Sequence, residues 1–199
     1  MGEICLSNIK GTAPSPQPEI EQFPIDVLDE GVQEDGERYL KIPPTPDMLV
    51  AAQKHAQSVF GNESMTLDEV RVWTDRNPFI TAILCSQWGQ YLGYFDALPL
   101  TEGGAARMES GAIEEKEITA DEVLAPQEMR NAKTIYVAGL AAKGNETELR
   151  KSRVAAMVAG LANYIEYFYR TEQRKIIAVA ATTARIGREI LTEHGERNF

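Results

Sequence analysis

The sequence of 199 residues contains few of the residues that mark metal centres, disulfides or membrane spans. Of its two cysteines, Cys5 lies in a tail-like segment and Cys85 in an apolar run, so both thiols are expected to be free, as in a reducing compartment. His55 and His194 are too isolated to build a metal site. No apolar run is long enough to cross a bilayer, and Met1 is not followed by a basic region and an apolar core. These absences predict a cytoplasmic protein without a metal.

Positive charge is scarce as well. The 20 basic residues are outnumbered by 30 acidic ones, which gives a formal net charge of −10. Nucleic-acid-binding surfaces are basic, so this balance argues against a nucleic-acid partner. The chain also lacks the G-x-S-x-G motif of serine hydrolases and the glycine-rich phosphate loop of nucleotide triphosphatases.

The first 37 residues differ in composition from the rest of the chain. They are rich in proline, glycine and acid, with nine carboxylates against the single cation Lys10. Such a composition rarely buries enough apolar surface to fold alone. Residues 1–37 are therefore predicted to form a flexible or loosely docked arm, in which "FPIDVL" could pack on the domain as a strap, and residues 38–199 to form the domain.

Two helix starts are marked by capping residues. Thr45 and Pro46 are typical of the beginning of a helix. Thr66 is followed three positions later by Glu69, the pattern of a capping box. This second helix is expected to end before Pro78, because the residue before a proline disfavours helical angles.

Apolar runs bounded by turn residues predict the strands, and periodic runs predict the remaining helices. The predicted strands are 38–43, 79–85, 90–100, 134–142 and 175–183. The second and third strands form a hairpin with Gly89 at the turn. The long polar excursion 99–133 is a candidate substrate lid. A long amphipathic helix follows Asn145, and a last helix ends at Gly195.

The order of these elements is β-α-α-β-β-β-α-β-α. A hairpin requires antiparallel pairing, whereas a strand–helix–strand unit requires parallel neighbours. The chain is therefore predicted to have an α/β (α+β) fold, in which a mixed, mostly antiparallel sheet carries helices on both faces. Residues 176–182 are expected to be a central parallel strand.

Over residues 38–199 this chain resembles the GCN5-related N-acetyltransferase (GNAT) superfamily. The resemblance rests on the paired helices after the first strand, the hairpin with "YLGYF", the strand "IYVAGLAA", the basic segment before the long helix, and "AATTARIGREILTEHG". The insertion "LPLTEGGAARMESGAI" is more similar to divergent members than to compact ones. The resemblance implies the acyl-CoA N-acyltransferase-like (GNAT) fold.

The resemblance also implies an activity, the transfer of an acyl group, most often acetyl, from acyl-CoA to an amine. In the superfamily the pantetheine arm pairs with the strand equivalent to 134–142, which assigns donor binding to the small-residue end of that strand. These residues are Gly139, Leu140, Ala141 and Ala142. Small side chains leave room for a ligand to approach the backbone, but they would equally fit beneath a packed helix.

The pyrophosphate loop of the superfamily has the form R/Q-x-x-G-x-G/A. Laid on this chain, it matches Arg150, Lys151, Ser152, Arg153, Val154 and Ala155. Arg153 stands where the first glycine is usual, so cationic side chains, together with nearby Lys143, are expected to replace some amide contacts to phosphate. The alternative is a solvated basic face balanced by Glu146 and Glu148.

The catalytic residues are not identified by the resemblance. In many relatives a tyrosine lies four residues before the glycine that ends the last helix, but that position holds Leu191. Candidate bases are Asp96, Glu115 and Glu117, without a spacing that supports any of them. The alternative function is therefore a catalytically inactive GNAT-fold binding or regulatory module.

Partners follow from the same resemblance. The acceptor is expected to be a small-molecule or protein amine, and the acyl donor acetyl-CoA, another acyl-CoA or an acyl group on a carrier protein.

In relatives two more strands follow the last helix, whereas this sequence ends at Phe199. The arm or a second copy of the chain, in a homo-oligomer, is expected to cover the open sheet edge.

Overall fold

The computed structural model describes residues 23–24, 35–145, 147–169 and 175–178, which form an α+β fold around one sheet. The strands are β1 (Phe23–Pro24), β2 (Arg38–Lys41), β3 (Thr81–Ser86), β4 (Tyr91–Leu100), β5 (Thr134–Ala142) and β6 (Lys175–Ala178). The helices are α1 (Pro46–Phe60), α2 (Leu67–Arg76), α3 (Glu102–Glu109) and α4 (Thr147–Phe168). The 3₁₀ turns are η1 (Gly61–Glu63), η2 (Glu115–Glu117), η3 (Ala120–Glu122) and η4 (Pro126–Asn131).

The six strands lie in the order β1-β2-β3-β4-β5-β6. Neighbours from β1 to β5 are antiparallel, and β5 and β6 are parallel. The predicted mixed, mostly antiparallel sheet is therefore confirmed. β6 is parallel, as expected for residues 176–182, but in the described part of the chain β5 is its one neighbour, and residues 179–182 lie outside the described residues.

The helix boundaries follow the capping residues. The Thr45 side chain accepts a hydrogen bond from the backbone N–H of Met48 at the start of α1. Thr66 and Glu69 form the reciprocal capping box of α2, which ends at Arg76. Each bond satisfies a backbone N–H that lacks a partner inside the helix, which explains why both helices begin where the sequence predicted.

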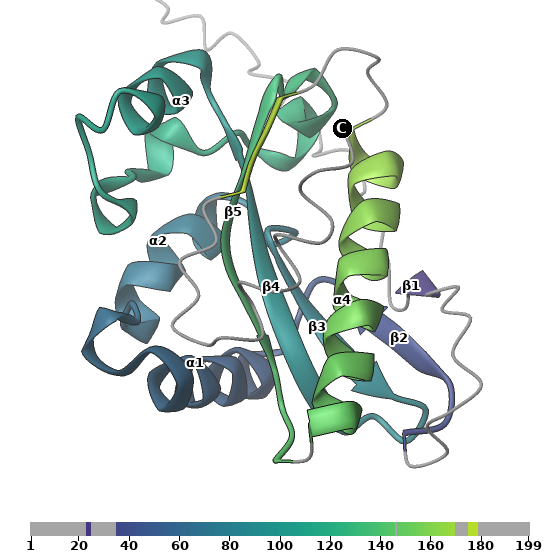
Figure 1. The fold of residues 1–199 in the computed structure, drawn as a ribbon. Coiled ribbons are helices and arrows are strands. Elements are labelled where there is room, and N and C mark those ends of the chain that lie inside the picture. The colour runs from purple at the N-terminus through teal and green to yellow at the C-terminus, as the bar shows by residue number, and fades with distance from the viewer. Residues whose placement is uncertain (1–22, 25–34, 146, 170–174, 179–199) are drawn as a thin grey trace, which may run out of the picture.

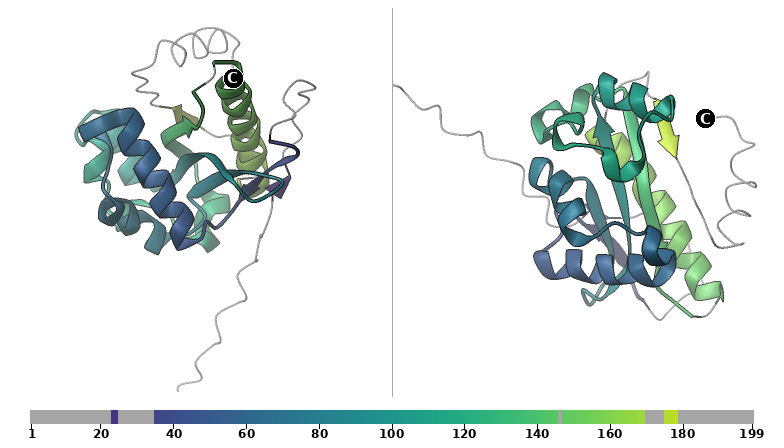
Figure 2. Two further views of the ribbon diagram at one scale, coloured as in Figure 1. Left: turned by 90° about the horizontal axis from the view of Figure 1, so that it is seen from below. Right: turned by 90° about the vertical axis from the view of Figure 1, so that its left-hand side faces the viewer.

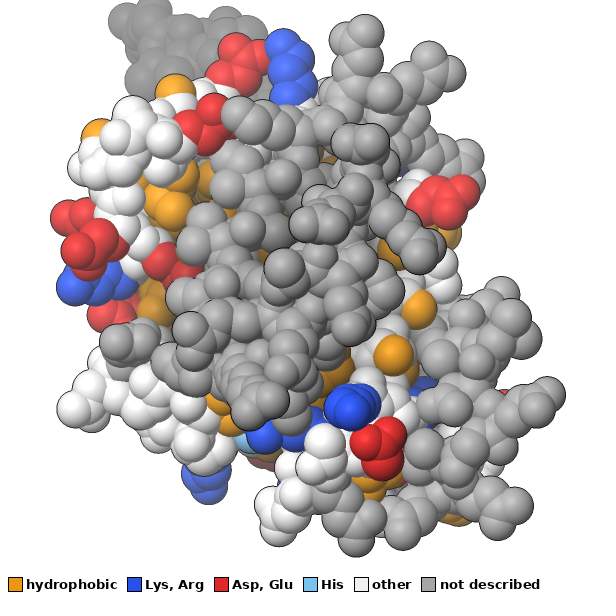
Figure 3. All heavy atoms as spheres, viewed as in Figure 1, with side chains coloured by type: hydrophobic (Ala, Val, Ile, Leu, Met, Phe, Trp, Pro, Cys, Tyr) orange, Lys and Arg blue, Asp and Glu red, His pale blue; other side chains and the backbone are white. Residues whose placement is uncertain are grey.

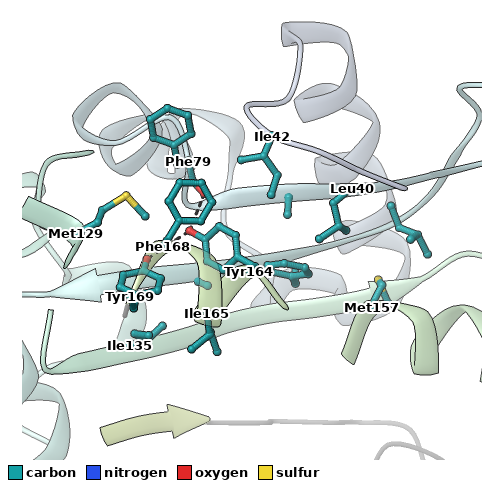
Figure 4. Packing of buried hydrophobic residues seen from close by; sticks show 14 of the residues in the cluster. Leu40, Ile42, Phe79, Met129, Ile135, Met157, Tyr164, Ile165, Phe168 and Tyr169 are labelled. Carbon is teal, nitrogen blue, oxygen red and sulfur yellow. Dashed lines mark hydrogen bonds between the residues drawn. The ribbon is translucent and has the colours of Figure 1, made fainter. Parts of the chain in front are cut away.

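The helices cover both faces of the sheet (Figures 1 and 2). α4 lies against one face, and α1, α2 and the excursion between β4 and β5 lie against the other. Beneath α4 the core is aromatic: the ring of Tyr164 lies 4.8 Å from Phe168 and 5.6 Å from Phe95, centroid to centroid. The buried hydroxyl of Tyr164 donates a hydrogen bond of 2.8 Å to the Phe79 carbonyl (Figure 4). This bond joins α4 to the start of β3.

The sequence makes the excursion 99–133 a candidate substrate lid. In the structure, it packs as a second hydrophobic core. Ile113, Ile118 and Val123 are buried with Trp73 of α2 and Tyr136 of β5. The indole N–H of Trp73 donates a hydrogen bond of 2.9 Å to the Ile118 carbonyl. The excursion is therefore part of the layer that covers this face of the sheet.

The expected arm contributes to the packed structure at two points. β1 pairs with β2 at one end of the described sheet. Asp35 is 2% exposed, so the packed part of the chain begins before Arg38. The remaining residues of the arm and the last predicted helix lie outside the described residues.

We predict that Trp73→Phe loosens the excursion and leaves the sheet intact. The substitution leaves the buried Ile118 carbonyl without its donor, which costs about 1–3 kcal/mol. Hydrogen exchange should become faster at the amides of 113–123 and stay unchanged in β3 and β4. Trp88→Phe is the matched control, because Trp88 is 60% exposed. Equal exchange in the two variants would contradict this role for Trp73.

Candidate functional site

The candidate site lies where the pairing of β5 becomes irregular. Asp96 of β4 is opposite Gly139, but the next residue, Ala97, is opposite Val137, so Ala138 is an extra residue in β5. The parallel pairing with β6 extends over Thr134–Val137. Beyond this point, β5 has a strand neighbour on the β4 side alone within the described residues. A β-bulge therefore lies directly after the part of β5 that pairs with the described residues of β6.

The small residues after the bulge have several roles. A Cβ at Gly139 would lie 3.3 Å from the Tyr94 hydroxyl and 3.5 Å from Asp96 Oδ2, so glycine allows both side chains to approach β5. Leu140 packs against the core beneath α4. Ala141 is buried in a cluster with alanines of α1, which agrees with the alternative of small residues beneath a helix. Ala142 is buried on the α4 side.

Two of the three candidate bases, Asp96 and Glu115, accept hydrogen bonds from side chains of the sheet. The hydroxyl of Thr81 donates a hydrogen bond of 2.5 Å to Asp96 Oδ1. The hydroxyl of Tyr136 donates one of 2.7 Å to Glu115 Oε2. Glu117 is exposed and accepts a hydrogen bond from the Glu114 backbone N–H, so its role is to cap a turn.

The environment shifts the acidity of these groups. Burial raises the pKa of Asp96 to about 7, the charge of Glu115 adds to the rise, and the Thr81 hydrogen bond opposes it. Burial also raises the pKa of Glu115, against the hydrogen bond from Tyr136. The pKa of Tyr94 rises through burial and the charge of Asp96. Asp96 can therefore exchange a proton near neutral pH, whereas Tyr94 stays neutral.

The basic motif has a different setting from the one expected. Residues 150–155 lie within α4, where backbone N–H groups beyond the first turn are used inside the helix. Lys151 pairs with Glu148 at 3.2 Å. The buried Ser152 hydroxyl accepts a hydrogen bond of 2.9 Å from Arg38. Val154 packs partly against the core, and Ala155 is exposed.

Arg153 is buried and paired with the arm. Its Nε and Nη2 donate hydrogen bonds of 2.8 and 2.5 Å to the two oxygens of Asp35, and its Nη1 donates one of 2.7 Å to the Lys143 carbonyl. Arg38 pairs with the same carboxylate at 3.0 Å. Burial raises the pKa of Asp35, but the bonds and charges of Arg153 and Arg38 outweigh it and hold that pKa below its usual value. The guanidinium of Arg153 is therefore engaged within the fold.

Sequence reasoning missed two residues and one turn. Asp35 is one of nine carboxylates in a polar arm, and nothing in the sequence distinguishes it. His55 lies on α1, half-buried and hydrogen-bonded through Nδ1 to the Tyr91 hydroxyl at 2.9 Å. Gly144, with a φ of 145°, makes the turn between β5 and α4, and the K-G-N triplet was the available signal.

No family model matches this chain, and no curated protein is significantly similar to it. Among the described residues, no helix is long and apolar enough to cross a membrane. The same part of the chain contains no group of three or more histidine, cysteine or acidic side chains that could hold a metal ion.

We predict that Asp35→Asn destabilises the fold by about 3–5 kcal/mol, because it leaves two buried guanidinium groups without a counter-charge. Urea unfolding followed by circular dichroism measures this loss. Asp68→Asn is the control, since the Asp68–Arg71 pair is exposed and contributes little. A loss no larger than in the control would show that the pairing of Asp35 does not stabilise the fold.

A second prediction concerns the pH dependence of stability. Folded Asp96 holds its proton up to a pH of about 7, whereas the unfolded side chain loses it near 3.8. This group therefore makes folding less favourable as the pH rises between these values. Asp96→Asn cannot ionise, so its melting temperature relative to the parent should rise from pH 5 to pH 8. A constant difference between the two proteins at both pH values would refute the raised pKa.

Proposed function

We propose that this chain is an acyl-CoA-dependent N-acyltransferase of the GNAT type. The observation that supports this best is the β-bulge at Ala138 of β5, which lies beside a carboxyl group whose pKa is near neutral. A bulge disrupts the ladder locally and leaves backbone donors and acceptors for a ligand. The antiparallel hairpin, the parallel β5–β6 pair and α4 between them have the order expected for such a fold.

The donor would lie along β5 beyond the bulge, on the side away from β4. Residues 138–142 offer their backbone to an extended pantetheine arm, as a further strand would. The turn after β5 carries Lys143, and Arg150 follows on α4. Lys143 is four residue steps along the strand from Gly139, about 13 Å, so cations lie at one end of this segment and Asp96 at the other. The proposed donor site does not use Arg153.

The chemistry assigned to the protein is a proton transfer. The bound thioester supplies the acyl group. The Asp96 carboxylate takes the proton that the attacking amine loses, the new C–N bond forms as the C–S bond breaks, and the departing thiolate is protonated from solvent. A carboxylate with a pKa near 7 suits this role at neutral pH, because it is half ionised there and still basic enough to accept the proton.

The acceptor would enter from the side of α1, α2 and the excursion, because Tyr94 and Tyr136 pack on that face. Asp96 follows Tyr94 by two residues in β4 and so points to the same face. An amine is consistent with the acidic groups there, whether it belongs to a small molecule or to a protein. An acyl group held on a carrier protein is an alternative donor, with the same pantetheine arm.

Binding and turnover test this proposal separately. Calorimetry and thermal shift with acetyl-CoA and CoA should show binding, with a stabilisation of about 2.7 kcal/mol at 100 times the dissociation constant. Turnover is measured as release of free thiol with a panel of primary amines. A parent protein that binds neither compound, nor an acyl-carrier protein, is not an acyltransferase of this kind.

Asp96→Asn should keep donor binding and lose about 10²- to 10⁴-fold in kcat/KM. Glu117→Gln is the matched control, since Glu117 caps an exposed turn and should keep parent activity. Donor binding by the parent without turnover on any amine would favour the inactive binding module. Equal activity of Asp96→Asn and parent would remove Asp96 from the mechanism.

A further inference from the structure

Two cations at the end of β5 have no carboxylate partner among the described residues. Their neighbours are paired: Lys151 with Glu148, and Arg153 and Arg38 with Asp35. No hydrogen bond or ion pair joins the side chain of Lys143 or of Arg150 to another described residue. Lys and Arg side chains lie together near the lower ends of β5 and α4 (Figure 3). In a protein of net charge −10, an unbalanced positive cluster needs a physical reason.

The turn that carries Lys143 is held on both sides. Its backbone N–H donates a hydrogen bond of 2.7 Å to the Leu92 carbonyl, and its carbonyl accepts one of 2.7 Å from Arg153. Arg150 lies against the same turn, because a Cβ on Gly144 would be 3.6 Å from the Cβ of Arg150. The backbone that carries both cations is therefore positioned before any ligand binds.

His55 of α1 contacts the start of β4, which is hydrogen-bonded to this turn through Leu92. Its Nδ1 lies 2.9 Å from the hydroxyl of Tyr91, the residue before Leu92, and its ring meets Tyr91 and Tyr94 edge-on. Burial lowers the pKa of His55, and the charges of Arg150 and Lys143 lower it further. Two tyrosines of β4 contact the ring, and the cations that act on its charge come from the turn and from α4. No carboxylate contributes to the shift within the described residues.

We propose that His55, Lys143 and Arg150 form one binding site for a phosphate-type dianion, and that His55 takes up a proton when the anion binds. The Nδ1 atom is held by Tyr91, so Nε2 is the nitrogen left to meet a ligand. Lys143 and Arg150 are shared with the proposed donor site, so the natural ligand depends on that proposal. The anion site itself does not depend on the proposed function, since any bound dianion would change the charge around the imidazole.

The direction of the pH dependence follows from the neighbouring charges. In the free protein burial and, to a smaller extent, the two cations hold the pKa of His55 below its usual value of 6.5, so the ring is neutral at pH 7. A bound anion reverses the sign of the local field, and an opposite charge within about 4–6 Å raises a pKa by about 1–3 units. Binding therefore consumes a proton, and anion affinity should increase about tenfold or more as the pH falls through the range in which His55 titrates.

The direct test is the titration of the His55 ring proton by NMR in sodium sulfate and in sodium chloride of equal ionic strength. Sulfate stays a dianion throughout this range, and chloride controls for salt screening of the two cations. The chain has two histidines, so His55→Gln assigns the signal. The pKa of His55 should be about 1 unit higher in sulfate than in chloride.

Two neighbouring residues of α4 supply a matched pair of variants. Arg150→Gln should remove most of the sulfate effect, whereas Lys151→Gln should keep it, because Lys151 pairs with Glu148. Equal pKa values of His55 in the two salts would overturn the inference, and so would equal effects of the two variants. If CoA binds while the pKa of His55 stays constant, this inference fails and the donor site stands. If sulfate shifts that pKa but no acyl donor binds, the anion site stands and the proposed function fails.

Discussion

The buried carboxylate of Asp35 determines the geometry of the molecule where β5 turns into α4. It accepts hydrogen bonds from Arg38 of β2 and Arg153 of α4, and Arg153 also binds the Lys143 carbonyl. One ion cluster thus joins the arm, the sheet, the long helix and the turn. Two guanidinium groups cannot remain in such a site without a counter-charge, because desolvation of an unpaired cation costs several kcal/mol. The arm is therefore part of the structure that holds the candidate site.

This cluster divides the basic residues of the motif into two groups. Arg153 and Arg38 are neutralised inside the protein, so they shape the turn without attracting a ligand. Lys143 and Arg150 have no such partner among the described residues, so no described carboxylate neutralises their positive charges. In the sequence motif all these cations look equivalent. Burial and pairing nevertheless give neighbouring residues of one helix opposite roles. Charge that is already paired adds little to the potential that an incoming anion experiences.

Much of the fold could be predicted from local signals. The caps at Thr45 and Thr66, the hairpin at Gly89 and the strand 134–142 each depend on residues close in sequence, and each was located correctly. The α4 helix was also expected, and residues 150–155, matched to a phosphate loop by resemblance, lie inside it, because basic residues are compatible with both.

The remainder depends on contacts between distant segments. The pairing of Asp35 with Arg153 spans 118 residues, and that of Asp96 with Thr81 requires the register of the hairpin. Composition made the arm look detached, since one carboxylate among many gives no sign that it is buried. His55 looked isolated for the same reason: Tyr91 and Tyr94 contact it, and the charges of Lys143 and Arg150 act on it, only after the sheet has formed. The bulge at Ala138 had no sequence signal beyond small residues, which are common beneath packed helices.

Tyr94 explains how acidic and basic groups remain separate on one face of β5. Its ring packs edge-on against His55 at 6.5 Å, and its hydroxyl lies close to Gly139, where Asp96 also approaches. Burial and the charge of Asp96 raise its pKa, so it is a neutral spacer between the two groups. If Lys143 or Arg150 reached Asp96, the pKa of that carboxyl would fall, yet it rises to about 7 and no cation contributes to its shift. The opposite charges are therefore held apart by the fold.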